Sequence, residues 1–571
     1  MLFNLFNREP EIPKVVPGSI KPVVLLVLDG FGLAPPSPGN AITQAKTPNY
    51  NYFLTNFPHG QLIASGESVG LPANEEGNSE VGHLTIGVGR VVFQSLMRIR
   101  AAIEDKSFFE NESFTKALVH VTAHNSKLHL IGLVGTGEVH SALSHFYALL
   151  ELCQKRQIKE VCLHLITDGR DAPPQEGKEI ITQIINTIKS TPNIKIATIS
   201  GRYYAMDRDR RWERTQLAYE AMVAGKGPQF ASPLEAVEAT YAEGKSDEFL
   251  LPSVMFKDGK PVGTVTDNDA IIFFNFRIDR PRQLTMAFTM PDFEDLKHFE
   301  LELEDSHHEG RPQQKKEIVA GRTFKREIWP KNLFFVTMTE YQKNIPVSAI
   351  AFPPFQVEDS LSKVLSDHNK QHLHLTESEK ERMVTYYFDG MKEGRTPGED
   401  VLIVPSPKVA TYDKKPDMST KSIVKEFITA LNKSNYHFFV MNFACPDMVG
   451  HTGNLKAAIR AVEAADQGLG QIANATLAVG GTFLMSADHG NVEELMSYPT
   501  GSFYFTTAKG DKDTSHSNNP VPIIIASPEL KGKPKQLMQG SLSDIAPTIL
   551  SIMDLPVPAG MTGRNLLEGI S

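Results

Sequence analysis

The sequence predicts an α/β fold made of two α/β domains, because short apolar runs of strand length alternate with longer stretches of helical periodicity. Continuous apolar runs are typical of strands buried on both faces, as in parallel sheets covered by helices. Such runs occupy residues 23–28, 128–134, 161–166, 271–276, 333–336, 437–443, 482–485 and 521–526. The helical pattern is clearest over residues 455–477, with apolar positions at Ile459, Val462, Leu469 and Ile472.

Three of these runs lead into an acidic residue, and two of the acids have a histidine close by. Asp29 follows the first run, Asp447 and His451 follow the run at 437–443, and Asp488 follows the next run along the chain. Ligands in open α/β sheets gather at the carboxyl ends of strands. We therefore expect the two chain ends to form one domain around an inserted one. The expected domains are residues 1–91 with 331–571, and residues 92–330.

Composition limits the class of protein. The chain has 571 residues, a net charge of −9, 41% hydrophobic and 22% charged residues, which excludes a disordered chain, a collagen-like repeat and a coiled-coil rod. The acidic balance argues against a nucleic-acid binder. Three cysteines suggest a reducing compartment, and neither a signal peptide nor a membrane-length apolar stretch is expected, so the prediction is a cytoplasmic protein with no membrane partner. The charged stretch at 302–326 is predicted to be a solvated surface insertion.

Carboxylates and imidazoles at the strand ends form a candidate metal site. The candidate ligands are Asp29, Asp447, His451, Asp488, His489 and His516. Asp447 and His451 are one helical turn apart and can face the same ion. A mixed set of this kind suits Mn²⁺, Zn²⁺ or Fe²⁺, and six ligands are too many for one catalytic ion with an open position, so two ions are expected. The alternative is that each acid is an ordinary turn or cap residue.

A candidate nucleophile lies in the turn at residues 77–83, Gly-Asn-Ser-Glu-Val-Gly-His. Ser79 is placed where a helix begins, among free backbone N–H groups that favour an anion. Beside a divalent ion its hydroxyl would be activated to attack phosphorus. The residues alone leave open whether Ser79 is this nucleophile or only the N-cap of the helix.

Arginines follow the predicted strands of the middle region. The predicted strands near the two chain ends are followed by acids instead. The arginines are Arg170, Arg202, Arg208, Arg277 and Arg280. A guanidinium fork matches carboxylate and phosphate oxygens, so several converging arginines would bind a small, doubly anionic substrate. The alternative is surface salt bridging, as the interleaved charges at 207–211 suggest.

Several long motifs together resemble cofactor-independent phosphoglycerate mutase, a family of the alkaline phosphatase superfamily. The resemblance extends from about Lys21 to Leu567 and implies an alkaline-phosphatase-like metal domain built from both chain ends, with a second α/β domain inserted. The motifs are Leu28-Asp29-Gly30, residues 77–83, Asp168-Gly169-Arg170-Asp171, residues 201–209, Asn275-Phe276-Arg277 with Asp279-Arg280, residues 338–341, residues 446–453 and residues 487–491.

The resemblance implies interconversion of 3-phosphoglycerate and 2-phosphoglycerate, in glycolysis and gluconeogenesis, through a phosphoserine on Ser79 and without 2,3-bisphosphoglycerate. One Mn²⁺ would be held by Asp447, His451 and His516. The other would be held by Asp29, Ser79, Asp488 and His489. Asp171 would be the general acid/base, and Lys380 would contact the phosphate. The implied substrate-binding residues are His140, Arg170, Asp171, Arg202, Arg208, Arg277, Arg280 and Lys380. The family resemblance also implies a monomer.

Three positions depart from the family's usual motifs: Thr136 and Ala142 on either side of His140, and Met383 after Lys380. Residues 502–513 also form a longer segment than the family usually has. Two alternatives remain: another metal-dependent enzyme of the superfamily, such as a phosphatase or phosphopentomutase, or a catalytically inactive scaffold. The arginine motifs argue against the first, and the retention of every ligand and of Ser79 argues against the second.

Overall fold

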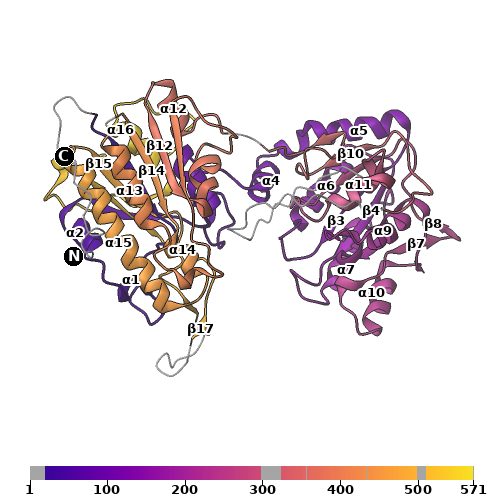
Figure 1. Cartoon of the computed structure of the whole chain (residues 1–571). Helices are drawn as coiled ribbons and strands as arrows, with labels where there is room; N and C mark the ends of the chain where they lie inside the picture. Colours follow the sequence, from indigo (N-terminus) through magenta and orange to yellow (C-terminus); the bar gives the residue numbers. More distant parts are fainter. Residues whose placement is uncertain (1–19, 297–322, 355–356, 434, 498–509, 570–571) are drawn as a thin grey trace. The chain divides into compact units, whose positions relative to one another are not determined.

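The computed structural model describes residues 20–296, 323–354, 357–433, 435–497 and 510–569 (Figure 1). The chain forms two compact units, described here each by itself. The outer unit contains the described residues up to Gln94 and from 357 onward, and the inserted unit contains residues 95–296 and 323–354. The expected second boundary at residues 330/331 is wrong. Strand β10 (Phe334–Thr337) pairs with β9 (Ala270–Phe273), so the chain completes the inserted sheet before it leaves this unit.

The outer unit is built on a sheet that has eight strands within the described residues. Their order is β13 (Glu399–Val404), β12 (His372–Glu377), β14 (Phe438–Phe443), β1 (Val23–Leu28), β15 (Thr482–Ser486), β18 (Val521–Ala526), β2 (His59–Ile63) and β19 (Gly540–Ser541). The strands from β13 to β15 are parallel, as the apolar runs predict for β14, β1 and β15. Strand β18 is antiparallel to both neighbours although it is equally apolar. Its apolar run reflects burial on both faces, which does not fix strand direction.

Helices cover this sheet. Helix α15 (Leu455–Ala478) contacts β1 and β15, and α13 (Thr420–Leu431) packs beside it and contacts β12 (Figure 1). The predicted helix at 455–477 is confirmed, and Val462, Leu469 and Ile472 are fully buried in the core of this unit. Helix α3 (Ser79–Val88) contacts α16 (Ile545–Ile552) near the other end of the chain.

The inserted unit has its own, mostly parallel sheet. The order of its main strands is β11 (Ala349–Ile350), β10, β9, β3 (Leu128–Val134), β4 (Val161–Thr167), β5 (Ile194–Gly201), β7 (Ser253–Lys257) and β6 (Gln229–Phe230). Alternate residues of one strand belong to different apolar clusters: Leu130 lies in one and Ile131 in the other. Both faces are therefore covered, by helices that include α5 (Glu112–His124), α6 (Leu143–Lys155), α7 (Gly177–Ile188), α9 (Trp212–Ala224), α10 (Pro233–Ala242) and α11 (Arg282–Thr289).

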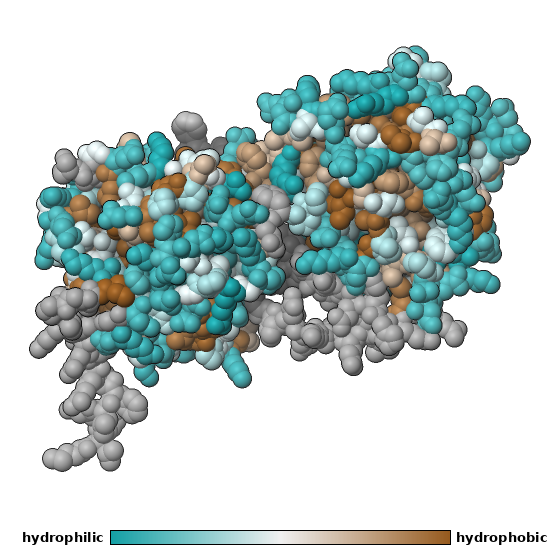
Figure 2. Space-filling view, turned by 90° about the horizontal axis from the view of Figure 1, so that it is seen from above, coloured by the Kyte–Doolittle hydropathy of each residue, from teal (hydrophilic) through white to brown (hydrophobic). Residues whose placement is uncertain are grey.

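The face of the molecule shown in Figure 2 is mostly hydrophilic on both units. Large exposed apolar side chains, such as Tyr52, Val119 and Leu217, belong to different elements. Among the residues described, no helix has the length and apolar character needed to cross a membrane. The predictions about the N-terminal segment, and most of those about residues 302–326 and 502–513, fall outside the described residues.

Candidate active site

Adjacent strands of the outer sheet deliver the predicted acids to one place. Strands β14, β1 and β15 are neighbours, and Asp29 follows β1 directly. Asp447 lies in the short helix α14 (Cys445–Gly450) after β14, and Asp488 follows β15. Lys380 ends a turn of 3₁₀ helix after β12, the next strand in the sheet. All four side chains are fully buried, so the structure brings together residues that are hundreds of positions apart in the sequence.

Ser79 is the first residue of helix α3 and faces this cluster. The N-cap is Asn78, whose side chain accepts a hydrogen bond from the backbone N–H of Val81 at 3.1 Å. The alternative in which Ser79 serves as the N-cap is therefore wrong. The buried Ser79 Oγ donates to Asp29 Oδ1 at 3.1 Å, lies 2.9 Å from His489 Nε2, and accepts from Lys380 Nζ at 2.7 Å.

Lys380 is the buried cation of the cluster. Its ammonium also lies 2.9 Å from Asp447 Oδ2 and 3.1 Å from Asp29 Oδ1. Burial alone would raise the pKa of both carboxyls, but Lys380 and the neighbouring histidines together outweigh burial and lower the pKa of Asp29 and Asp447 below the usual range. Ser79 Oγ thus lies between the ammonium of Lys380 and the ionised carboxylate of Asp29, and the same ammonium also contacts the ionised Asp447.

The Nε2 atoms of His451 and His516 face each other, and this arrangement favours the binding of a cation by both rings. His451 Nδ1 lies 2.8 Å from the carbonyl of Thr514, and His516 Nδ1 lies 2.8 Å from the carbonyl of Gly77. A carbonyl only accepts, so each Nδ1 carries a hydrogen, and in the neutral rings both lone pairs are on Nε2. The two Nε2 atoms lie 3.1 Å apart, and both face Asp447 Oδ1. Metal-binding histidines commonly have this arrangement, with the other ring N–H bonded to a carbonyl.

His489 joins the two halves of the cluster. One ligand atom from each of Asp29, Asp488 and His489 lies within 4.8 Å of the others, and the same is true of Asp447, His489 and His516. Burial lowers the pKa of His489, but the carboxylates of Asp488, Asp29 and Asp447 raise it to about 10. Two overlapping carboxylate–imidazole sets of this kind fit divalent transition-metal ions.

Sequence reasoning missed the residues that orient the acids. Asn442 Nδ2 donates to Asp29 Oδ2 at 2.6 Å and lies 3.1 Å from His83 Nε2. His83 Nδ1 bonds to the carbonyl of Ser79 at 2.9 Å and lies 3.1 Å from Asp488 Oδ2, and Asn491 Nδ2 donates to Asp447 Oδ1 at 3.2 Å. Asn442 is a fully buried polar residue within the apolar strand β14, and this position is the signal that could have identified it.

The inserted unit gathers the predicted arginines in the same manner, at the ends of neighbouring strands. Arg202 is the centre of this cluster and only 2% exposed. It donates to Asp168 Oδ1 at 2.7 Å and to Asp171 Oδ2 at 2.5 Å, and it lies 2.9 Å from His140 Nε2. His140 follows β3, Asp168 and Asp171 follow β4, and Arg202 follows β5.

Three of the other four predicted arginines have carboxylate partners, as the salt-bridge alternative expected. Arg170 donates to Glu248 at 2.5 Å, while Arg208 and Arg277 donate to Asp279 at 2.7 and 3.2 Å. Arg280 donates to the carbonyl of Met206 at 3.1 Å. Asp168, Glu248 and Asp279 were not predicted as site residues, although Asp168 and Asp279 belong to motifs noted in the sequence.

Positive charge nevertheless dominates this cluster. Burial and the nearby arginines, Arg202 first among them, lower the pKa of Arg280 to about 10. Burial and Arg202 likewise lower the pKa of His140 to about 3, so its imidazole is neutral at physiological pH. An excess of guanidinium groups around a neutral imidazole favours a small anion.

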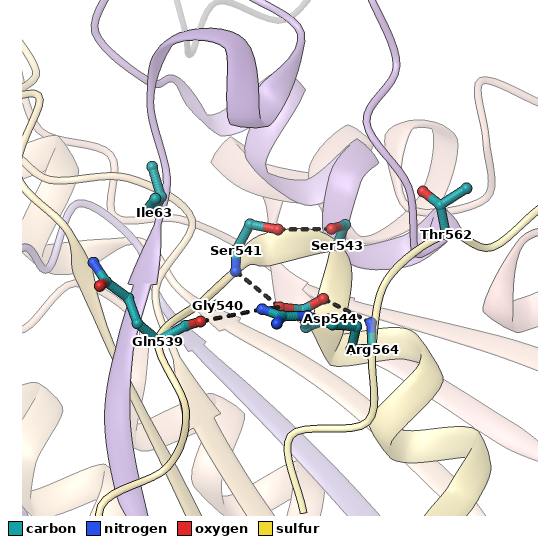
Figure 3. Close-up of a pocket in the computed structure, with 8 residues that line it drawn as sticks. All are labelled: Ile63, Gln539, Gly540, Ser541, Ser543, Asp544, Thr562 and Arg564. Carbon is teal, nitrogen blue, oxygen red and sulfur yellow. Dashed lines mark hydrogen bonds and ion pairs between the residues drawn. The ribbon is translucent and has the colours of Figure 1, made fainter. Parts of the chain in front are cut away.

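A separate pocket of about 420 Å³ in the outer unit lies beside the start of α16 (Figure 3). Asp544 accepts from the backbone N–H groups of Ser541 and Arg564, and the hydroxyls of Ser541 and Ser543 bond to each other. The polar groups of the pocket satisfy one another, and none of the residues lining it was a predicted site residue. The pocket gives no chemistry that competes with the two clusters.

The sequence matches known proteins over nearly its whole length. A family model described as "BPG-independent PGAM N-terminus" matches residues 99–343. Relatives named 2,3-bisphosphoglycerate-independent phosphoglycerate mutase include proteins of Moorella thermoacetica and Chloroflexus aggregans. The first is 44% identical over 96% of this chain and 98% of its own length. The second is 45% identical over 96% and 98%.

A solved structure gives the same fold. The crystal structure of Leishmania mexicana phosphoglycerate mutase at low cobalt concentration matches 97% of this chain and 99% of its own chain. The TM-score is 0.56 and the sequence identity is 28%. This similarity extends through both units, so the insertion of one α/β unit into another is a shared architecture.

Proposed function

Because this chain belongs to the family of 2,3-bisphosphoglycerate-independent phosphoglycerate mutases, we propose that it interconverts 3- and 2-phosphoglycerate through a phosphoserine on Ser79. The observation that carries the proposal is the surrounding of the buried Ser79 Oγ by Lys380 Nζ, His489 Nε2 and Asp29 Oδ1 at 2.7, 2.9 and 3.1 Å. Such surroundings fit a hydroxyl that reacts, since a cap or core serine needs neither a buried ammonium nor a buried carboxylate and imidazole.

Two divalent ions, which we propose to be Mn²⁺, belong to this site. Asp447, His451 and His516 would hold one, and Asp29, Ser79, Asp488 and His489 would hold the other. The facing Nε2 atoms of His451 and His516 support the first set, because two neutral imidazoles with lone pairs 3.1 Å apart repel each other and a cation bound by both removes that repulsion. Divalent ions supply the positive charge that phosphoryl transfer requires.

In the first half-reaction Ser79 Oγ attacks phosphorus. The Oγ–P bond forms as the bond from phosphorus to the 3-oxygen of the substrate breaks, and the glycerate oxygen takes up a proton. Lys380 stabilises the anionic form of Oγ by its hydrogen bond, and backbone N–H groups of the first turn of α3 favour the negative charge. A proton that leaves Oγ has an acceptor at Asp29 Oδ1.

In the second half-reaction the 2-hydroxyl of glycerate attacks phosphoserine, so the new P–O bond forms as the Oγ–P bond breaks. We assign the proton transfers at glycerate to Asp171. Burial would raise the pKa of Asp171, but its bond to Arg202 lowers it, so the group is a carboxylate ready to accept the hydroxyl proton. Because the phosphoryl group stays on Ser79 between the steps, 2,3-bisphosphoglycerate is not needed.

The arginine cluster of the inserted unit is assigned to substrate recognition. Arg202, Arg277 and Arg280 offer forked donors that match the carboxylate and phosphate of phosphoglycerate. The neutral His140 beside Arg202 adds a donor or acceptor for a hydroxyl without adding charge. The remaining members of this set are Arg170 and Arg208, which are about half exposed.

The test is mutase activity on protein stripped of metal. The protein receives 3-phosphoglycerate and Mn²⁺, without 2,3-bisphosphoglycerate, and 2-phosphoglycerate is followed through enolase. Product formation that depends on Mn²⁺ alone supports the proposal. Release of inorganic phosphate would show instead that water intercepts the phosphoserine, and no turnover with bound metal would reject the proposal.

A further inference from the structure

A second buried group of histidine and carboxylate side chains lies in the outer unit, formed by residues outside the catalytic cluster. His374 lies in β12, Glu399 begins the adjacent strand β13, and Asp389 follows the π-helix η6 (Met383–Tyr387). One ligand atom from each of the three lies within 4.8 Å of the others. Their exposed fractions are 0, 6 and 1%, so water does not solvate the two carboxyls.

Each carboxyl of this triad is fixed through one oxygen and has its other oxygen without a partner. Ser362 Oγ donates to Asp389 Oδ1 at 2.5 Å, and the backbone N–H and hydroxyl of Thr396 donate to Glu399 Oε2 at 2.8 and 3.0 Å. Among the described residues, Asp389 Oδ2 and Glu399 Oε1 have no hydrogen-bond partner. A buried acceptor without a partner costs free energy, and one anchored oxygen beside one bare oxygen is how single-oxygen metal ligands are oriented.

The imidazole of the triad is oriented like the imidazoles of the catalytic cluster. His374 Nδ1 lies 2.5 Å from the carbonyl of Val384, which fixes a hydrogen on Nδ1 and the lone pair on Nε2. His372 Nδ1 lies 2.9 Å from His374 Nε2, and His372 Nε2 lies 3.4 Å from Thr396 Oγ1. His372 can carry its hydrogen on Nε2 and bond to Thr396, which leaves His374 Nε2 free to bind a cation.

The inserted unit contains a different buried histidine–carboxylate cluster, formed by Asp269, His129 and His164, which serves as a comparison. In this cluster the polar groups satisfy one another, as expected of a purely structural role. Asp269 accepts from the backbone N–H of Lys127 through Oδ1, and from Thr266 and His129 through Oδ2. Both oxygens of Asp269 therefore have donors, and His129 is satisfied by Asp269 and His164. The triad of His374, Asp389 and Glu399 differs because its two carboxyls each lack a partner on one oxygen.

We propose that His374, Asp389 and Glu399 form a third metal site, which binds a divalent transition-metal ion such as Zn²⁺ or Mn²⁺. Nitrogen and carboxylate ligands in a three-residue set suit these ions. The ion would balance two carboxylates that otherwise lie buried side by side, where burial and Glu399 raise the pKa of Asp389 well above its usual range. It would also tie the segment after Lys380 to strands β12 and β13.

The decisive measurement is an anomalous difference map from crystals of the whole chain grown with Zn²⁺ and recorded above the zinc absorption edge. A peak between His374, Asp389 and Glu399, in addition to peaks at the catalytic cluster, supports the proposal. Peaks at the catalytic cluster alone would overturn it and would leave the two acids as a proton-sharing pair. The measurement uses the unaltered protein, so it does not depend on whether a variant folds.

Metal analysis of variants gives an independent test. The double variant Asp389→Asn, Glu399→Gln should bind one ion fewer per chain than the wild type after dialysis against Zn²⁺. Asp269→Asn is the matched control, because it removes an equally buried acid beside a histidine and should leave the metal content unchanged. An unchanged ion count in the double variant would refute the third site. Asp488→Asn should lose an ion while the triad keeps its own, so failure of the catalytic assignment is distinguishable.

Discussion

Lys380 offers the sharpest test of the catalytic cluster, because one ammonium serves three groups. Lys380→Met keeps the length of the side chain and removes the contacts to Ser79 Oγ, Asp29 Oδ1 and Asp447 Oδ2 at 2.7, 3.1 and 2.9 Å. Loss of one preorganised donor to a reacting oxygen lowers kcat by about 10²–10³-fold. We expect this loss in the enolase-coupled assay at saturating Mn²⁺, with metal content close to that of the wild type.

The same variant has a stability effect that depends on metal. Removing one partner of a buried ion pair costs about 3–5 kcal/mol, because it leaves a buried charge uncompensated. In metal-free protein this should lower the melting midpoint, followed by circular dichroism, by roughly 5–10 °C. Bound ions compensate Asp29 and Asp447, so the loss should be smaller in the metal-loaded protein.

The control for both measurements is Lys363→Met, which makes the same chemical change at an exposed pair with Asp367. An exposed pair of this kind contributes less than about 1 kcal/mol, so activity and melting should stay close to the wild type. A Lys380→Met enzyme with kcat within about threefold of the wild type would contradict the expected effect of one donor. Equal melting losses with and without metal would contradict the electrostatic argument.

Four further outcomes are expected. Ser79→Ala should abolish mutase activity with the circular dichroism spectrum unchanged, and substantial residual turnover would exclude Ser79 as the nucleophile. Arg202→Lys should lower kcat/KM by at least about 30-fold, since a lysine cannot contact Asp168 and Asp171 through one nitrogen and His140 through another, and a near-normal value would remove Arg202 from recognition. At limiting Mn²⁺, activity should fall steeply from pH 8 to 6 and recover with excess Mn²⁺, because the histidine ligands must be neutral; a flat profile would count against them. Burial raises the pKa of Glu377 from 4.5 to about 7, so between these pH values the folded state holds a proton that the unfolded state has lost. The free energy of unfolding therefore falls as pH rises through this range, by at most about 3 kcal/mol. Glu377→Gln should therefore gain melting temperature over the wild type as pH rises from 5 to 8, and a difference that is independent of pH would refute this assignment.

The sequence predicts the strands that carry the catalytic cluster because they are uniformly apolar. Strands β1, β14 and β15 have that character, and their acids follow directly. Strand β12 is missed because histidines alternate with leucines in His-Leu-His-Leu-Thr-Glu, which looks like a half-exposed strand or a loop. Its histidines are nevertheless fully buried, since His374 Nδ1 bonds to the carbonyl of Val384 and His372 Nε2 to the hydroxyl of Thr396. A buried strand is not recognised from the sequence when it contains polar residues whose hydrogen-bond partners are known only from the folded structure.

The second domain boundary was misplaced for a related reason. The run at 333–336 correctly predicts a strand, but an apolar strand fits either sheet equally well. Its partner is β9, more than 60 residues earlier, and only the long-range pairing decides which unit it joins. Sequence analysis did not identify Asn442, His83 and Asn491 as site residues for the same reason, because each contacts a catalytic-cluster residue that is distant in the sequence.

The position of β1 in the middle of the outer sheet has a consequence during synthesis on the ribosome. Val23 pairs with Phe438, about 415 residues further along the chain, and the other partner, β15, emerges later still. At about 5–20 residues per second, β1 waits roughly 20–80 s for its first neighbour. Every strand of the inserted sheet emerges before Phe438, so that unit can fold on the nascent chain first. Meanwhile Val-Val-Leu-Leu-Val-Leu stays unpaired, and a six-residue apolar segment without charge is prone to aggregate. Production of this enzyme should therefore depend on chaperones that shield the first strand until the last quarter of the chain arrives.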